Sequence, residues 1–256
     1  MNRRAFTGAL AGFAAAVPAR TADPAKRTRF YMLETYQLKN GTQAGRMNDW
    51  FSQSLLPKLT KIQAAPPIVL EGLLGPRVQQ IVLVVGYSSI AEIETTHSKL
   101  RADQDLAAAR QKLDQGAEPP FEAQTNTLLE AMDFSPELAA EKRDKPRVFE
   151  MRTYHSPTDS QLRLLRNRLG GPSQVVFRKF GIRPILYGTT LAGTTMPSLT
   201  YLIPYESLAE REKAWDGLNA DADWIKARTE SVEKGGQILS VSEVTFYRAT
   251  AYSPVK

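Results

Sequence analysis

The chain repeats itself at one constant spacing of 118 residues, and this repeat limits the folds that it can adopt. Each identity is weak by itself, but the same spacing holds from the first candidate strand to the C-terminal residues. The matches include Thr35-Tyr36 with Thr153-Tyr154, Tyr87 with Tyr205, Ala102-Asp103 with Ala220-Asp221, and Ser135-Pro136 with Ser253-Pro254. Two copies of one unit indicate one fold used twice, and their junction becomes a candidate position for a site.

Hydrophobic periodicity predicts the order β-α-β-β-α-β in each copy. In the second copy, apolar and polar residues alternate over 147–154, with Phe149 and Met151 on one face and Glu150 and Arg152 on the other. The strands of the first copy are predicted at 30–37, 68–74, 80–86 and 123–132, with helices at 43–62 and 89–113. In the second copy the later strands are predicted at 184–191, 199–203 and 238–249, with helices at 206–217 and 222–233.

This order of elements is that of a ferredoxin-like unit, in which two helices cover one face of a four-stranded antiparallel sheet. The other sheet face needs a partner, because an exposed apolar face promotes association. We therefore predict an α+β fold: two tandem ferredoxin-like repeats, 28–133 and 147–256, packed sheet to sheet as a pseudo-dimeric α+β barrel. The charged and proline-rich stretch 134–146 is the predicted linker.

The first 22 residues have the pattern of an export signal. Arg3 and Arg4 precede Phe6, an apolar run covers 9–17, and small residues follow at Val17-Pro18-Ala19. The paired arginines are typical of a twin-arginine signal, although an ordinary secretion signal or a basic tail has a similar composition. The apolar run is too short to span a bilayer. We expect a bacterial periplasmic protein without an integral membrane segment.

Composition removes several kinds of chemistry. The chain has no cysteine and only two histidines, His97 and His155, so thiol catalysis, disulfides and iron–sulfur clusters are excluded. We expect no metal site and predict no cofactor, although a haem with one histidine ligand and a cation bound by carboxylates both remain compatible with the sequence. The net charge of +6 is scattered along the chain, with no basic stripe interleaved with aromatic residues, and nucleic acid is not an expected partner.

Several stretches resemble the second domain of the NIPSNAP family. They are Phe149-Glu150-Met151-Arg152-Thr153-Tyr154-His155, Gly181-Ile182-Arg183-Pro184-Ile185-Leu186-Tyr187, Leu199-Thr200-Tyr201-Leu202-Ile203-Pro204-Tyr205, Arg211-Glu212-Lys213-Ala214-Trp215 and Asp223-Trp224. The first copy resembles the family more faintly, through Glu34-Thr35-Tyr36-Gln37-Leu38. The resemblance implies a dimeric α+β-barrel fold, and it brings no agreed catalytic residues.

Six residues form the candidate cavity. If Phe149 and Met151 face the helices, then Glu150, Arg152 and Tyr154 face the barrel interior, and the repeat places Glu34 and Tyr36 there too. Two interpretations stay open: a polar cavity that holds a small acidic or phenolic ligand, or a buried Glu34–Arg152 ion pair that docks the halves. His155, at the end of its strand, is either an accessible imidazole or a hydrogen-bonded turn residue.

Three classes of function remain. The first is an exported protein that binds a small molecule or a partner without chemistry. The second is a dimeric α+β-barrel enzyme, monooxygenase-like or haem-using, that acts in a cavity between the repeats, an expectation that rests on fold analogy. The third is a structural protein that assembles into homo-oligomers. Whether the protein is an enzyme is not decided by the sequence.

Overall fold

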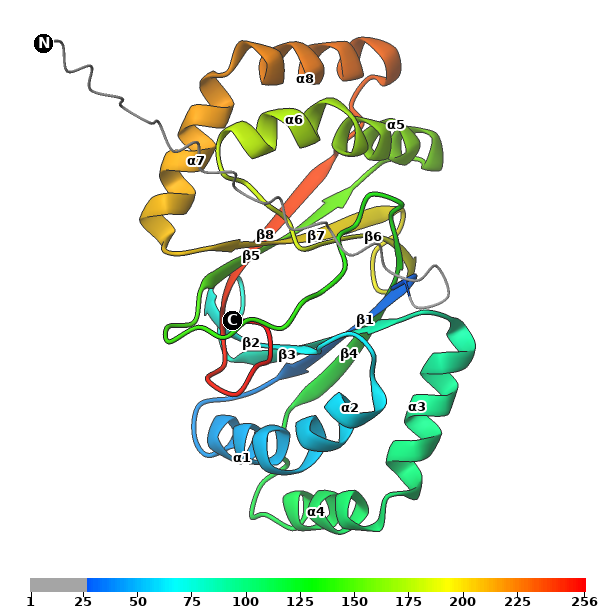
Figure 1. Cartoon of the computed structure of the whole chain (residues 1–256), viewed down its shortest axis with the longest axis vertical. Coiled ribbons are helices and arrows are strands. Elements are labelled where there is room, and N and C mark those ends of the chain that lie inside the picture. Colours follow the sequence, from blue (N-terminus) through cyan, green and yellow to red (C-terminus); the bar gives the residue numbers. More distant parts are fainter. Residues whose placement is uncertain (1–26) are drawn as a thin grey trace, which may run out of the picture.

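A computed structural model of the chain describes residues 27–256 and shows eight antiparallel strands closed into one barrel with helices on both sides (Figure 1). The strands are β1 (Phe30–Gln37), β2 (Ile68–Leu74), β3 (Gln80–Tyr87), β4 (Ala123–Ala131), β5 (Val148–His155), β6 (Leu186–Ala192), β7 (Ser198–Tyr205) and β8 (Val241–Ala249). Around the barrel their order is β1-β3-β2-β8-β5-β7-β6-β4. The predicted α+β barrel is confirmed.

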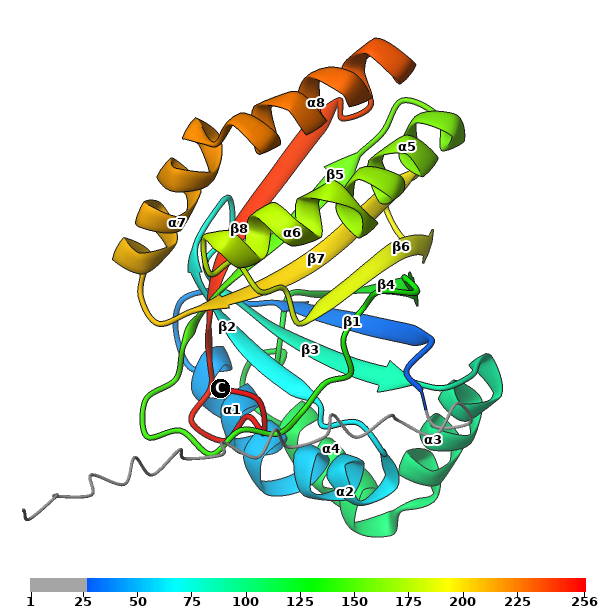
Figure 2. The same ribbon diagram turned by 45° about the horizontal axis from the view of Figure 1, so that its top comes forward.

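The helices form two separate layers, one for each half of the chain. The first layer contains α1 (Gln43–Trp50), the π-helical turn η2 (Phe51–Leu55), α2 (Leu56–Ile62), α3 (Ile90–Ala102) and α4 (Gln104–Asp114). The second layer contains α5 (Asp159–Gly170), α6 (Pro172–Lys179), α7 (Leu208–Ala220) and α8 (Ala222–Gly235). The turned view shows the two layers on opposite sides of the strands (Figure 2).

The 118-residue spacing is visible in the structure itself. The first and last residues of β1 and β5 differ by 118, and the same is true of β3 with β7, α3 with α7, and β4 with β8. The halves meet along two seams of antiparallel pairs, β2 with β8 and β4 with β6. Positions related by the repeat are therefore structurally equivalent, and they can be compared residue by residue.

Local capping explains why the second helical region of each half is divided into two helices, α3 and α4 in the first half and α7 and α8 in the second. Ser89 and Ser207 cap α3 and α7 by accepting from the backbone N–H three residues later. Asp103 and Asp221 then cap α4 and α8, and each has an extended backbone that ends the preceding helix. The single helix predicted over 89–113 was wrong in this respect, because Asp103 divides it into two.

The segments that follow β4 and β8 fasten each half to the other. The Ser135 hydroxyl accepts a hydrogen bond from the backbone N–H of Tyr187 at 3.0 Å, and the Ser253 hydroxyl accepts one from Val69 N–H at 3.1 Å. Val69 and Tyr187 are equivalent positions, so the repeated Ser-Pro makes one contact twice. Leu138 and Val255 from the same segments are buried in the barrel cluster. The two halves thus share a single packed interior.

Two predictions concern membranes and export. Within residues 27–256, no helix combines the length and the apolar character needed to cross a membrane. The predicted export signal with Arg3, Arg4 and Phe6 lies outside the described residues.

Candidate functional site

The predicted orientation of the candidate residues was inverted. Phe149 and Met151 belong to the barrel cluster together with Tyr31 and Leu202, whereas Tyr154 packs in the helix-side cluster of its own half. Alternation identifies two faces of β5, but both faces are buried here, so polarity did not reveal which one faces the barrel. The space between the repeats, where the sequence suggested a polar cavity, holds a cluster of buried apolar side chains that includes Tyr31, Phe149 and Leu202.

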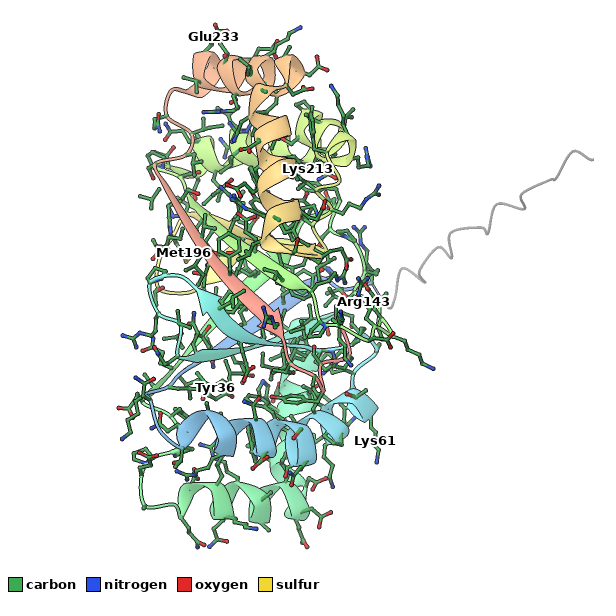
Figure 3. The ribbon with its side chains drawn as sticks, turned by 90° about the vertical axis from the view of Figure 1, so that its left-hand side faces the viewer. Tyr36, Lys61, Arg143, Met196, Lys213 and Glu233 are labelled. Carbon is green, nitrogen blue, oxygen red and sulfur yellow. The ribbon has the colours of Figure 1, made fainter. Side chains whose placement is uncertain are left out.

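It follows that Glu34 and Arg152 do not form the docking ion pair considered from the sequence. Each lies on the helix side of its own strand, β1 or β5, with the barrel between them. Figure 3 marks Tyr36 on the helix side of the first half, between the strands and the helices. The candidate residues therefore divide into two sites, one for each half.

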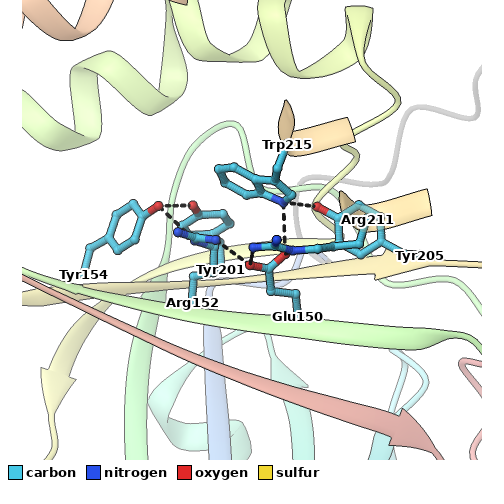
Figure 4. A network of polar contacts seen from close by, with 7 residues as sticks. All are labelled: Glu150, Arg152, Tyr154, Tyr201, Tyr205, Arg211 and Trp215. Atoms are coloured by element: carbon cyan, nitrogen blue, oxygen red, sulfur yellow. Dashed lines mark hydrogen bonds and ion pairs between the residues drawn. The ribbon is translucent and has the colours of Figure 1, made fainter. Parts of the chain in front are cut away.

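In the second half, the candidate residues form a closed polar network beneath α7 (Figure 4). The Glu150 carboxylate is fully buried and accepts two hydrogen bonds from Arg211, at 2.9 and 3.1 Å, besides an ion pair with Arg152. Trp215 Nε1 donates to Glu150 Oε2 at 3.0 Å and to the Tyr205 hydroxyl at 2.8 Å. This carboxylate is thus fully paired, as a buried charge requires.

Arg152 occupies the centre of the same network. Its Nε donates to the Tyr154 hydroxyl at 2.9 Å, and its guanidinium lies 4.1 Å from the centre of the Trp215 ring. Burial opposes the charge on Arg152, but Tyr201, Tyr154 and Glu150 outweigh it and raise the pKa of the guanidinium. The arginine is held as a cation by its neighbours, and its donors are directed at protein groups.

In the first half, the equivalent space is a cavity of about 420 Å³ between the sheet and the helices. Its lining comprises Glu34, Tyr36, Trp50, Leu55, Leu59, Leu83, Val85, Tyr87, His97, Leu100, Arg101, Leu106, Ala107, Arg110, Gln124 and Asn126. Small-molecule sites commonly have this size and this mixture of an apolar wall with a few polar groups. It brings together Glu34 and Tyr36 of the predicted set and none of the other four.

The carboxylate of Glu34 is the most unusual group in this cavity. Glu34 is 9% exposed, and Oε2 accepts a hydrogen bond from the Tyr36 hydroxyl at 2.6 Å. Burial, and then the neighbouring Glu34 charge, raise the pKa of Tyr36 above its usual range, so its hydroxyl remains a donor. Among residues 27–256, Glu34 is in no ion pair and its Oε1 accepts no hydrogen bond. That oxygen is available to a ligand.

The repeat shows why only the first half has this cavity. Larger or charged side chains of the second half stand where the first half has smaller ones: Trp215 against His97, Tyr201 against Leu83, Trp224 against Leu106, and Arg211 against Ile93. Arg152 is likewise the repeat equivalent of Glu34. The network under α7 therefore occupies the volume that the first half leaves open.

The two histidines lie in other environments than the sequence predicted. His97, expected on the surface, is half-buried and lines the cavity, while His155, expected to be accessible or in a turn, is buried at the end of β5. His155 Nε2 lies 3.2 Å from a carboxylate oxygen of Glu243. The signal for His97 was its repeat partner Trp215, because a position that holds a core tryptophan in one half faces the core in the other.

No group of three or more histidine, aspartate or glutamate side chains that could hold a metal ion comes together in the part of the chain from 27 to 256. His97 is the imidazole that lines the cavity, and Glu34 supplies the carboxylate. The cavity can accept a hydrogen-bond donor at Glu34 and surround the remainder of a molecule with leucine and aromatic side chains.

The fold and the cavity define an α+β-barrel protein with a helix-covered pocket in one half. Solved structures with this fold include an anthrone oxidase-like protein (11% identity, 88% of this chain and 93% of that one, TM-score 0.54). They also include candidate monooxygenases of Fusobacterium nucleatum subsp. nucleatum (7%, 87% and 92%, TM-score 0.56) and Lactobacillus acidophilus (10%, 90% and 98%, TM-score 0.54).

The second half carries a NIPSNAP domain: the sequence pattern of that family matches residues 149–254. The matched range lies in the half with the closed network, and the cavity lies in the other half. No curated protein matches the sequence. The structural likenesses, all far below 25% identity, establish the fold.

Proposed function

We propose that the first half of the chain binds a small, largely apolar molecule whose hydroxyl or ammonium group donates a hydrogen bond to Glu34. The observation that carries this proposal is a buried carboxylate with one free oxygen at the wall of a 420 Å³ cavity. Binding cavities are largely apolar and contain a few polar groups that fix the orientation of a ligand, and the second oxygen of Glu34 is such a group. The fully paired Glu150 shows how the same fold satisfies a buried carboxylate with protein groups alone.

A direct test uses 2-naphthol as the probe and calorimetry as the readout. A hydrogen bond to a charged group contributes about 1.5–3 kcal/mol, so Glu34→Gln weakens 2-naphthol binding by about 10- to 100-fold. Glu94→Gln, an exposed residue of α3 outside the cavity, makes the same change in charge and leaves binding unchanged. Equal affinity of the wild type and Glu34→Gln for the probe would refute the proposal.

A second candidate function is an enzyme that uses molecular oxygen in the same cavity. Glu34 can accept a hydrogen bond from a bound aromatic hydroxyl and can take its proton at the moment when oxygen oxidises the ring, and general bases need such proximity. The oxidase-like and monooxygenase-type names of the structural neighbours agree with this candidate. Oxygen consumption on addition of an oxidisable phenol, lost in Glu34→Gln, supports it. No consumption in the wild type leaves binding alone.

A haem-using enzyme is a third outcome that the same preparation tests. His97 is the imidazole in the cavity wall that would serve as the axial ligand. A Soret band in the freshly purified protein, absent in His97→Ala, would establish haem and displace the phenol-binding proposal. Protein without visible absorption, to which added haemin does not bind, excludes this candidate.

We also propose that the protein is exported to a bacterial periplasm. Support comes from Arg3, Arg4 and Phe6 ahead of an apolar run of the kind that twin-arginine signals contain. Cell fractionation of the full chain tests this. We expect periplasmic protein from the wild type and cytoplasmic protein from an Arg3→Lys, Arg4→Lys variant, and equal distribution of both would refute the twin-arginine route.

A further inference from the structure

The cavity of the first half has a gradient of polarity from its floor to its mouth. Glu34 and Tyr36 are buried at the floor, whereas Arg101 is exposed and Arg110 is half-buried. Leucine side chains also line the cavity, among them Leu83, which lies beside Glu34 on β3. A ligand that fills this cavity therefore meets a buried acceptor at Glu34, apolar walls and an exposed cation at Arg101.

The two arginines at the mouth differ in how they are paired. Arg110 Nε lies 3.1 Å from Asp114 Oδ1, and its guanidinium lies 5.5 Å from the centres of both the Trp50 and the Phe121 rings. Arg101 takes part in no ion pair among residues 27–256, and its guanidinium donates a hydrogen bond to Ser98 at 3.2 Å. Arg101 is thus the cation that remains available for an anionic group.

The carboxylates closest to Arg101 along the chain are already engaged. Asp103 and Asp105, in the turn between α3 and α4, both form ion pairs with Lys58, at 2.7 and 3.1 Å. They are accordingly neutralised by a different cation. In the second half, where the cavity is closed, Arg101 is replaced by Asn219. The free cation and the open cavity thus occur together.

The walls favour a flat ring. Tyr36, Trp50 and Tyr87 line the cavity, and aromatic side chains contact a ring through offset or edge-to-face geometries that aliphatic chains cannot supply. Tyr36 already contacts Phe51 and Phe121 edge to face at 5.5 and 5.2 Å, so its ring is fixed in place.

We propose that the molecule bound in this cavity is an aromatic hydroxy acid, with its hydroxyl on Glu34 and its carboxylate on Arg101. The inference rests on the proposed binding function and adds the second end of the ligand. The acid group lies at the mouth, remote from the Glu34 charge, since the two anions would repel one another if both were at the floor.

Three naphthalene probes test the two ends separately: 6-hydroxy-2-naphthoate, 2-naphthol and 2-naphthoate. An exposed ion pair contributes up to about 1 kcal/mol, so the hydroxy acid binds wild-type protein about fivefold more tightly than 2-naphthol. Arg101→Gln removes that advantage and leaves 2-naphthol binding unchanged. Lys99→Gln, an exposed cation of the same helix outside the cavity, preserves the advantage. 2-Naphthoate, which lacks the donor for Glu34, binds more weakly than the hydroxy acid.

Failure of this inference differs from failure of the proposed function. If 2-naphthol and the hydroxy acid bind equally well, or if Lys99→Gln acts like Arg101→Gln, the acid end is wrong while binding at Glu34 stands. If neither hydroxyl-bearing probe binds at about 1 mM, both proposals are wrong. Circular dichroism of Arg101→Gln confirms that the fold is intact, and the unchanged affinity for 2-naphthol provides a second check.

Discussion

Two substitutions of the same kind, Glu34→Gln and Glu150→Gln, should have opposite effects on stability. Both residues are buried glutamates on the helix side of equivalent strands, and glutamine has nearly the same shape as glutamate. Glu150 has Arg152, Arg211 and Trp215 as partners, whereas Glu34 has the Tyr36 hydroxyl. The first change removes an unpaired charge and the second breaks a buried ion-pair network.

The magnitudes follow from what each side chain leaves behind. Removing one partner of a buried pair costs about 3–5 kcal/mol, and the lower end applies to Glu150 because the Arg211 side chain is 25% exposed. Glutamine at 34 still accepts from Tyr36, and the loss of an unpaired charge changes the free energy of unfolding by less than about 1 kcal/mol, in the stabilising direction. For a protein of this size, about 3 kcal/mol lowers Tm by roughly 6–12 °C.

Urea-induced unfolding followed by tryptophan fluorescence gives both free energies, and scanning calorimetry gives both Tm values. We expect Glu150→Gln to lose about 3 kcal/mol and Glu34→Gln to equal or exceed the wild type. The result that refutes the reasoning is a Glu34→Gln protein that loses as much stability as Glu150→Gln. Glu34 would then be a structural residue, and its role in ligand binding would lose its main support.

Three further predictions follow from the repeat, the seams and the buried tyrosines. His97→Trp places in the first half the side chain that fills the second, so 2-naphthol binding disappears while the midpoint of urea unfolding does not fall. Ser135→Ala and Ser253→Ala each remove the acceptor of a buried backbone N–H and should each cost about 1–3 kcal/mol by urea unfolding, with additive losses in the double variant. Burial raises the pKa of Tyr31 and of Tyr247 to about 12, so the stability that the neutral forms contribute is complete below about pH 10 and is lost between about pH 10 and 12. Alkaline unfolding curves should therefore steepen in that range and flatten in Tyr31→Phe, and identical curves for this variant and the wild type would contradict the assignment.

The fold could be read from the sequence because the repeat and the alternation are independent signals that agree. Equal spacing from Thr35 to Ser253 predicted equivalent halves, and period-two alternation predicted the strands on which they meet. The division of the helix at Asp103 was missed in the first half, although the equivalent region of the second half was predicted as two helices, 206–217 and 222–233. Transferring each signal to the matched position would have corrected the error.

The site could be predicted only in part, because it depends on which face of a strand is covered by helices. Phe149 and Glu150 lie on opposite faces of β5, and both are fully buried, so polarity did not distinguish the barrel side from the helix side. Glu34 and Tyr36 were nevertheless predicted as site residues, because the repeat makes them equivalent to Arg152 and Tyr154. No sequence pattern predicted the volume of the cavity. That volume depends on the difference in size between His97 and Trp215 once each is packed in its own half.

The joining of the two halves in one chain has a consequence for how such a cavity can arise. A homodimer assembled from single repeats carries every side chain twice, so an unpaired carboxylate introduced for binding would destabilise both subunits. In a fused gene the seams, with their exchanged Ser-Pro contacts, must stay matched, but the two helix layers are free to diverge. One copy can keep a group that weakens the fold while the other accumulates contacts that strengthen it. Two repeats in one chain can therefore differ at equivalent positions, whereas the subunits of a symmetric homodimer must carry the same residues.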